Sequence, residues 1–218
     1  MQQFEQHEQF EMEVLDNLNS GRYLDNLVFG GGTMLRLCHE MNRYSVDMDF
    51  YFKKELNTGG YFTKLKENLT GKYTITDAND KFNTLLIELR HSRYLSRLKI
   101  EINKKKRFSE YTSSIAFSPY STRQVLVNTL TLEQMMINKI ETLLDRKEIR
   151  DAFDIEFIIR RGIKFPANPE NVKGVTSAVA AFKKKDYDVT LGSLLPPDIR
   201  GYYREHRFDF LLAHLKNL

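Results

Sequence analysis

The sequence predicts an α+β (α/β) fold, with a mixed α/β N-terminal half followed by an all-helical C-terminal half. Up to about residue 128, short apolar runs bounded by turn residues, which are typical of strands, occur among helical patterns. From Leu132 onward, apolar residues recur only at helical spacing. We therefore expect an α/β domain over residues 1–128 and a helical domain over residues 129–218.

The expected elements follow from periodicity and from capping or turn residues. The first helix carries Phe4, Phe10 and Leu18 among polar residues and ends near Gly21, and a later helix is closed by Gly71. In the N-terminal half we expect helices over 3–19, 34–41 and 58–69 and strands over 27–29, 46–52, 73–76, 82–89, 94–102 and 124–127. In the C-terminal half we expect helices over 132–145, 150–161, 169–184 and 197–217.

The composition is that of an ordinary globular protein. The chain has 218 residues, of which 41% are hydrophobic and 28% charged, with a formal net charge of +4. Its longest apolar runs are far short of the roughly 20 residues that span a membrane, and the N-terminus does not resemble a signal peptide. The single cysteine, Cys38, cannot form an internal disulfide. We expect a cytoplasmic protein with no membrane partner.

A glycine-rich turn stands between a predicted strand and a predicted helix. Gly30-Gly31-Gly32-Thr33 follows the apolar run Leu27-Val28-Phe29 and precedes the amphipathic stretch from Met34 to Met41. Glycine lets the backbone approach a phosphate closely, and the free N–H groups at a helix start favour an anion. Such a turn, taken alone, is more often only a turn. Its place before a helix makes it a candidate phosphate-binding site.

Two aspartates follow in a run with strand periodicity. Asp47 and Asp49 alternate with apolar residues, so both carboxylates point to one face, where hard cations such as Mg²⁺ find oxygen ligands. Arg43 and Ser45 share their parity and could reach the same phosphates. A solvated strand face is the commoner meaning of Asp-x-Asp. The order of glycine turn and carboxylate pair favours a site that uses a nucleoside triphosphate.

These residues resemble a known enzyme family. Gly31-Gly32-Thr33 with Arg43-x-Ser45-x-Asp47-x-Asp49 is similar to the first motif of the nucleotidyltransferases related to the AbiEii toxin, within the DNA polymerase β-like superfamily. Downstream, Glu133–Ile140 resembles the family's lysine-bearing helix, and Arg150–Ile155 resembles its Arg-Asp-x-x-Asp segment. The resemblance covers roughly residues 25 to 160, and its motifs occur in the family's order.

The resemblance implies a fold, a reaction and a set of site residues. The fold would be a nucleotidyltransferase-type mixed sheet flanked by helices, followed by a helical domain that completes the active-site cleft. The reaction would move a nucleoside monophosphate from an NTP to an acceptor hydroxyl with Mg²⁺ (or Mn²⁺). The metal would be held by Asp47, Asp49 and Glu101, and the nucleotide by Gly31, Gly32, Thr33, Arg43, Ser45 and Lys139.

Three of the implied residues have ordinary structural alternatives. Glu101 could simply face solvent beside Lys99. Lys139, in an apolar helix, could be a surface lysine whose stem packs on the helix. Asp151 could favour the start of its helix or pair with Arg150. Asp151 and Asp154 share a helix face, and the resemblance makes one of them catalytic or lysine-orienting without deciding which.

The resemblance also implies a biological setting. Related proteins act as toxins of toxin–antitoxin or phage-defence systems, which implies a cognate antitoxin, and some modify tRNA 3′ ends. Basic clusters are consistent with RNA as a partner, although each could be a solvated surface; they are Lys104–Arg107, Arg146-Lys147, Arg160-Arg161 and Lys183–Lys185. The alternatives are nucleotidyl transfer to a protein or small molecule, and a catalytically inactive nucleotide- or RNA-binding module.

Overall fold

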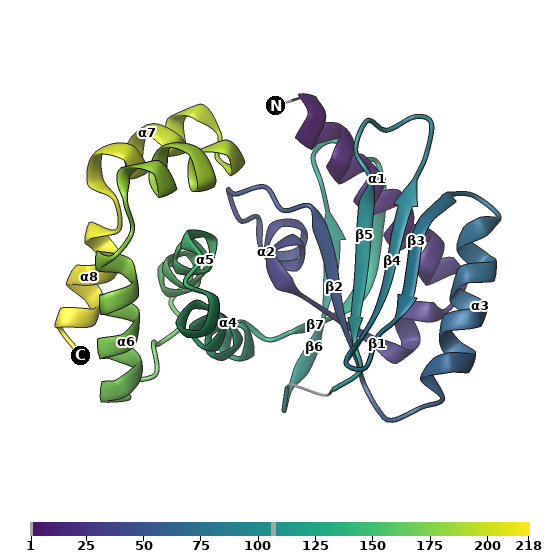
Figure 1. Ribbon diagram of the computed structural model, residues 1–218, viewed down its shortest axis with the longest axis horizontal. Helices are drawn as coiled ribbons and strands as arrows, with labels where there is room; N and C mark the ends of the chain where they lie inside the picture. The colour runs from purple at the N-terminus through teal and green to yellow at the C-terminus, as the bar shows by residue number, and fades with distance from the viewer. Residues whose placement is uncertain (1, 106–107) are drawn as a thin grey trace. The chain divides into compact units, whose positions relative to one another are not determined.

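The chain folds into a unit built on a β-sheet, which extends to Leu130, and an all-helical unit, Thr131–Leu218. Figure 1 shows the computed structural model, which describes residues 2–105 and 108–218. The change from one unit to the other falls where strand periodicity gives way to helical periodicity. This is a mixed α/β structure with a nucleotidyltransferase fold, as the sequence predicts.

The first unit is built on one seven-stranded mixed sheet with the strand order β3-β4-β5-β2-β1-β7-β6. Two of its neighbouring pairs, β2–β5 and β1–β7, are parallel, and the others are antiparallel. Its strands are β1 (Leu27–Gly30), β2 (Asp47–Phe52), β3 (Thr74–Asp80), β4 (Thr84–Arg90), β5 (Leu98–Asn103), β6 (Tyr111–Phe117) and β7 (Gln124–Leu130). Its helices are α1 (Gln2–Ser20), a short 3-10 helix η1 (Tyr23–Asn26), α2 (Gly31–His39) and α3 (Thr58–Thr70).

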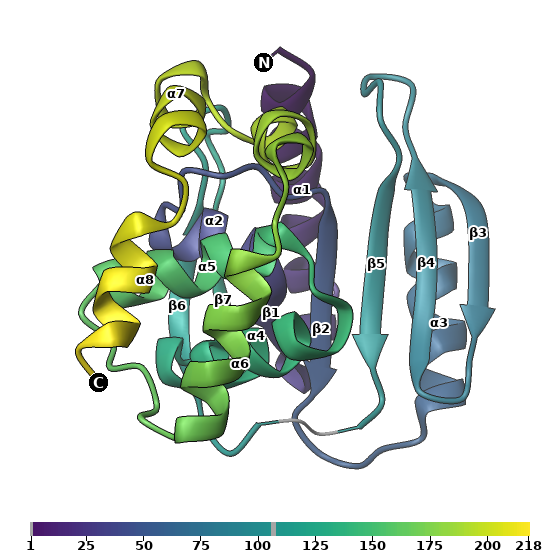
Figure 2. The same cartoon turned by 60° about the vertical axis from the view of Figure 1, so that its left-hand side comes forward.

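The two faces of this sheet differ in burial because side chains alternate along a strand. On β2, Met48, Phe50 and Phe52 are buried, whereas the intervening residues, including both aspartates, are only partly buried. Helices α1 and α3 run along the sheet (Figure 2), and apolar side chains of both helices are buried. Asn57 caps the start of α3, since its side chain accepts a hydrogen bond from Gly60 N.

The second unit consists of helices joined by short connections. They are α4 (Leu132–Arg146), α5 (Ile149–Arg160), α6 (Pro169–Ala180), the π-helical η2 (Asp186–Leu191), the 3-10 turn η3 (Gly192–Leu194), α7 (Pro197–His206) and α8 (Asp209–Lys216). Thr131 caps the start of α4, since its hydroxyl accepts a hydrogen bond from Gln134 N. Helix α5 is buried along most of its length, so it forms the centre of this unit. Across residues 2–105 and 108–218, no helix is long and apolar enough to cross a membrane.

The structure corrects several expected boundaries. A strand not predicted from the sequence, β6, covers Tyr111–Phe117. The Asp-x-Asp strand begins only at Asp47, and the strand expected over 94–102 begins at Leu98. The helix expected over 169–184 ends at Ala180. The helix expected over 197–217 is two helices, because Arg207 adopts a φ of 51° between them.

Candidate active site

The glycine turn packs directly against the residues that the sequence grouped with it. Gly31, the first residue of α2, has a φ of +72°, which favours glycine. A Cβ built on Gly31 would overlap the carboxylate of Asp49. A Cβ on Gly32 would lie 2.6 Å from Arg43 Nη2 and 2.8 Å from Ser45 Oγ. The absence of side chains at both positions therefore lets the turn contact Asp49, Arg43 and Ser45.

Strands β2 and β5 bring the three predicted carboxylates onto neighbouring positions. In their parallel register Asp47 lies beside Lys99, and Asp49 lies beside Glu101. Asp49 and Glu101 also line a small cavity of about 60 Å³ together with Thr84 and Asn103. The side chains of Asp47 and Glu101 are about one-third exposed, at 32% and 36%. The side chains of Asp47 and Glu101 are thus accessible to a ligand, and Glu101 lies on the strand next to the Asp-x-Asp strand.

A lysine ammonium lies between two of these carboxylates. Lys99 Nζ is 3.3 Å from Asp47 Oδ2 and 3.0 Å from Glu101 Oε1. Burial opposes the charged form of Lys99, but hydrogen bonding to Glu101 and the charges of Asp47 and Glu101 outweigh it and raise the pKa of the lysine. Glu101 therefore does more than face solvent beside Lys99, because it forms an ion pair with that lysine.

The donor set fits a hard divalent cation. Within the described part of the chain, no three His, Cys, Asp or Glu side chains already converge as a metal site. However, Asp47, Asp49 and Glu101 supply carboxylate oxygens, the ligand type that Mg²⁺ prefers. The ammonium of Lys99 already stands in for a cation between two of them. These three carboxylates are the residues that would hold the metal.

A buried polar network that the sequence did not predict supports the glycine turn and β2 from beneath. Thr33 Oγ1 donates a hydrogen bond of 2.6 Å to the carbonyl of Asp47 and lies 3.4 Å from Glu11 Oε1. On the neighbouring turn of α1, His7 Nε2 lies 3.0 Å from the carbonyl of Val46. Both α1 side chains are buried. The only sequence signal is the placement of polar residues at helical spacing among the apolar residues of α1.

Burial controls the protonation of Glu11. Its side chain is fully buried, and desolvation, followed by the nearby charge of Glu8, raises the pKa of Glu11 well above its usual value. Glu8 itself is paired with Arg36 at 2.7 Å and accepts a hydrogen bond from Ser118. A protonated Glu11 would donate to Thr33, which in turn donates to the backbone of Asp47.

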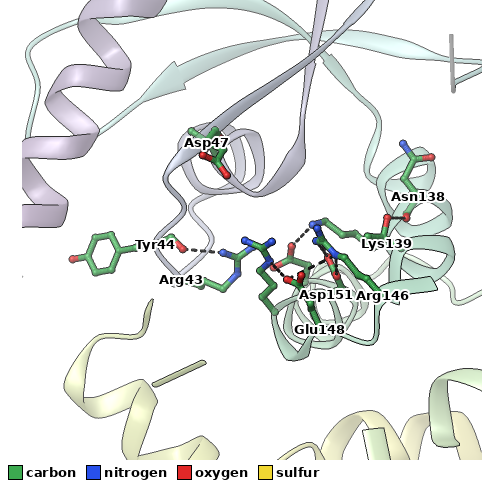
Figure 3. A network of polar contacts seen from close by, with 12 residues as sticks. Arg43, Tyr44, Asp47, Asn138, Lys139, Arg146, Glu148 and Asp151 are labelled. Carbon is green, nitrogen blue, oxygen red and sulfur yellow. Dashed lines mark hydrogen bonds and ion pairs between the residues drawn. The ribbon is translucent and has the colours of Figure 1, made fainter. Parts of the chain in front are cut away.

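The helical unit contains a second charged cluster, in which two buried aspartates bind Lys139. Figure 3 shows Lys139 and Arg146 beside one of them, Asp151. Lys139 Nζ lies 3.1 Å from Asp151 Oδ1 and 2.7 Å from Asp154 Oδ2. Arg146 also binds Asp151, with Nε 2.8 Å from Oδ2 and Nη2 2.9 Å from Oδ1. Both aspartates are completely buried, and Lys139 is only 8% exposed. The alternative in which Lys139 is a surface lysine is therefore wrong.

The ion pairs of this cluster also contradict the alternative in which Asp151 pairs with Arg150. Asp151 is paired with Arg146 rather than with Arg150, whose Nε lies 2.5 Å from Glu148 Oε2. The spacing of three residues does place Asp151 and Asp154 on one face of α5, since both contact Lys139. The geometry is that of two carboxylates that fix the position of one lysine.

Comparison with known proteins identifies the family. The family model described as nucleotidyl transferase AbiEii toxin, Type IV TA system, matches residues 13–215. The chain belongs to the AbiEii family. This confirms the resemblance drawn from the glycine turn, the Asp-x-Asp strand and the two downstream segments. A search of curated proteins finds no match.

Two solved structures share the fold of this AbiEii chain. JHP933 from Helicobacter pylori is 18% identical, with a TM-score of 0.52, and the match covers 96% of this chain and 92% of that chain. An H. pylori protein named for a proposed nucleotidyltransferase activity is 19% identical, with a TM-score of 0.53, and the match covers 96% of both chains. At these identities the likeness concerns the fold. The AbiEii family itself indicates a nucleotidyltransferase toxin that uses an NTP and is paired with an antitoxin.

Proposed function

We propose that this AbiEii chain transfers a nucleoside monophosphate from an NTP to an acceptor hydroxyl and releases pyrophosphate, in a reaction that depends on Mg²⁺ or Mn²⁺. One observation carries the proposal. The carboxylate of Asp49 packs against Gly31 of the glycine turn and lies next to Glu101 in the sheet register. Backbone suited to phosphate and carboxylates suited to a cation therefore meet at one point of the first unit.

The triphosphate would be held by residues around the glycine turn. Gly31 and Gly32 let the phosphates approach the backbone, and the start of α2 favours negative charge. Arg43 is buried at 2% exposure and donates through Nη1 to the carbonyl of Tyr44 at 2.8 Å, so its guanidinium is held in place near Gly32. Ser45 supplies a hydroxyl to the same cradle. The Thr33 hydroxyl is buried and donates to the carbonyl of Asp47, so Thr33 would contribute to the cradle through its backbone.

The chemical step is an in-line displacement at the α-phosphorus. A bond forms between the acceptor oxygen and the α-phosphorus, while the bond to the β-phosphate oxygen breaks and pyrophosphate leaves. Asp47, Asp49 and Glu101 would hold the metal, and the chemistry that it would supply there is Lewis-acid polarisation of the phosphates. The carboxylate of Glu101 is the group we assign to receive the proton of the attacking hydroxyl, in addition to its role as a metal ligand.

Lys139 is the residue we assign to neutralise charge on the leaving pyrophosphate. Asp151 and Asp154 hold its ammonium between them, which supports orienting roles for both carboxylates. We propose the role of Lys139 in this reaction on the basis of family membership. On the same basis we propose that the helical domain, residues 129–218, completes the active-site cleft. A fixed lysine acts as a point charge on phosphate oxygens.

For the acceptor we propose RNA, with tRNA 3′ ends as the first candidate, in the cytoplasm. The exposed basic cluster Lys183–Lys185 supports a polyanionic partner. The alternative acceptors are a protein or a small molecule. In a different class, the chain could bind a nucleotide or RNA without catalysis, but the accessible carboxylates beside the glycine turn favour an enzyme.

Turnover of NTP by wild-type and aspartate variants tests the proposal. Asp47→Asn and Asp49→Asn remove a metal-binding charge while keeping the side-chain shape, so each should lower transfer of α-phosphate label by about 10³-fold or more. Asp25→Asn, at an exposed pair with Arg22, should behave as wild type. Full activity in both site variants would contradict the assignment. Label that is retained but never transferred by the wild type would favour the binding module.

A further inference from the structure

The position of Lys99 has a consequence for cation binding. Lys99 and Glu101 are two apart on β5, so their side chains share one strand face, and the register with β2 sets Lys99 beside Asp47. Its ammonium contacts one oxygen of Asp47 and one of Glu101. Both of these residues belong to the set that would hold the metal. The lysine therefore uses carboxylate oxygens that a divalent cation would need.

We propose that Lys99 is a built-in counter-cation of the carboxylate cluster, which a divalent metal must displace, and that this residue sets the metal affinity of the site. The inference rests on the proposed function, since it takes Asp47 and Glu101 as metal-holding residues. Lys99 is in this sense a residue that tunes the site, and it takes no part in the bond-breaking step.

Electrostatics gives Lys99 two opposing effects. Close carboxylates repel each other, so an ammonium between them stabilises the folded chain when no metal is bound. The same ammonium competes with an incoming cation through both charge repulsion and occupied oxygens. A lysine suits such a displaceable role because its charge sits on a flexible stem, and the Lys99 side chain is 34% exposed, which leaves it a path toward solvent.

An ion pair close to Lys99, between Arg97, just before β5, and Glu88 on β4, is an ordinary surface contact. Arg97 lies two residues before Lys99 and pairs with Glu88 at 2.8 Å, with side-chain exposures of 59% and 27%. That pair does not involve the predicted metal-holding residues. Arg97 therefore offers a matched control, because its replacement removes one positive charge nearby without freeing oxygens of Asp47 or Glu101.

The experiment measures Mn²⁺ affinity directly rather than activity. The full-length wild type, Lys99→Met and Arg97→Met are titrated with Mn²⁺, and free Mn²⁺ is followed by electron paramagnetic resonance. We expect the Mn²⁺ dissociation constant to fall about tenfold in Lys99→Met, the scale of one close unit charge in a partly solvated site. In Arg97→Met it should change less than about twofold. In EDTA, Lys99→Met should melt at a lower temperature than wild type, and Mn²⁺ should raise its melting temperature by more than that of wild type.

Two results would overturn the inference. If wild type binds Mn²⁺ and Lys99→Met binds it equally or more weakly, Lys99 is not a competitor, although the proposed metal site stands. If neither binds Mn²⁺, the metal site of the proposed function fails together with the role of Lys99. Lys99→Gln keeps a polar side chain and should reproduce the gain in affinity, so it replaces the methionine variant if that does not fold.

Discussion

Gly31 joins the backbone of the phosphate cradle to the carboxylate of Asp49. Its left-handed φ of +72° and the overlap that a Cβ would make with Asp49 are independent reasons why a side chain is unfavourable there. A sequence shows that glycines occur before a helix, but it does not show which glycine touches which carboxylate. The contact depends on the antiparallel pairing of β1 with β2, in which Gly30 lies opposite Asp49.

We expect Gly31→Ala to lower turnover by about 10²-fold or more, because the methyl group would displace a carboxylate that holds the metal. An alanine in this left-handed backbone conformation should also lower the unfolding free energy by about 1–2 kcal/mol. Turnover is measured per folded molecule, and stability by urea unfolding. Gly59→Ala, in the first turn of α3 where a Cβ meets only Asn57 Oδ1 at 3.7 Å, serves as the control. Equal turnover in both variants would show that the turn does not position Asp49.

Glu11 should make stability depend on pH. Its folded-state pKa is raised, so between its unfolded pKa of about 4.5 and its folded pKa the folded chain binds more protons than the unfolded chain. This contribution to stability is present below pH 4.5 and is lost as the pH rises through the folded pKa. In Glu11→Gln that decrease should disappear, so the difference in unfolding free energy between pH 5 and pH 8 should shrink. The measurement is a set of unfolding curves at several pH values, with Glu67→Gln, at an exposed position, as the control. A pH dependence of the unfolding free energy that is unchanged in Glu11→Gln would contradict the prediction.

At the scale of elements, the two central helices of the C-terminal unit are joined by charge as well as by apolar packing. Lys139 on α4 meets Asp151 and Asp154 on α5, and all three side chains are buried. A buried ion cluster is costly to break, because removing one partner leaves the others desolvated without compensation. If Lys139 acts in the proposed reaction, its contributions to activity and to stability are coupled.

We expect Lys139→Met to lower the unfolding free energy by about 3 kcal/mol or more, since it leaves Asp154 buried without its ammonium partner. Adding Asp154→Asn should recover part of that stability, because it removes one of the two buried carboxylate charges that Lys139 had balanced. Turnover per folded molecule should fall by about 10²-fold in both variants, as the lysine charge is absent in each. If Asp154→Asn restored turnover along with stability, Lys139 would have only a structural role.

The elements differ in how far the sequence could predict them. Strand β2 could be predicted because its aspartates alternate with apolar residues, and α3 could be predicted because Gly71 closes its helical pattern. Strand β6 was missed because Tyr111–Phe117 lies at a sheet edge and carries threonine and serine where a buried strand would carry apolar residues. The break at Arg207 has no local signal such as glycine or proline; the buried side chain of Phe208 follows it.

The site residues divide in the same way. Motif order was enough to group Gly31, Asp49 and Glu101, because strand periodicity and a family resemblance both bear on them. Strand register places the ammonium of Lys99 between Asp47 and Glu101. Helix packing brings the side chain of Glu11 to the hydroxyl of Thr33. Residues that are distant in the chain meet there, and no local pattern records such contacts.

At the scale of the whole molecule, the excess of positive charge is mild but clustered. Lys183–Lys185 is exposed, whereas Lys104 is already engaged with Asp80 and with the carbonyl of Lys81. Lys106 and Arg107, which complete the predicted cluster that begins at Lys104, lie outside the described residues. Lys183–Lys185 is therefore the better place to look for phosphate contacts.

If RNA is the acceptor, its affinity should fall steeply with salt, because phosphate contacts release counterions. Replacing Lys183, Lys184 and Lys185 by Gln should reduce the slope of log affinity against log salt by about one unit for each phosphate that the cluster no longer neutralises. NTP binding, which rests on the glycine turn and carboxylates, should change little. The measurement is tRNA binding at several salt concentrations, with Lys64→Gln as a control for charge alone. An unchanged slope would exclude this cluster from the RNA-binding surface.

The central claim, nucleotidyl transfer, is tested most directly by following the two ends of the triphosphate. Each of the four NTPs is supplied with label on either the α- or the γ-phosphate, together with Mg²⁺ and total cellular RNA. We predict that α-label appears on small RNA while γ-label leaves as pyrophosphate in equal amount, and that Asp49→Asn abolishes both signals. Transfer of γ-label to any acceptor, or no transfer of α-label from any NTP to RNA, protein or small molecule, would contradict the account.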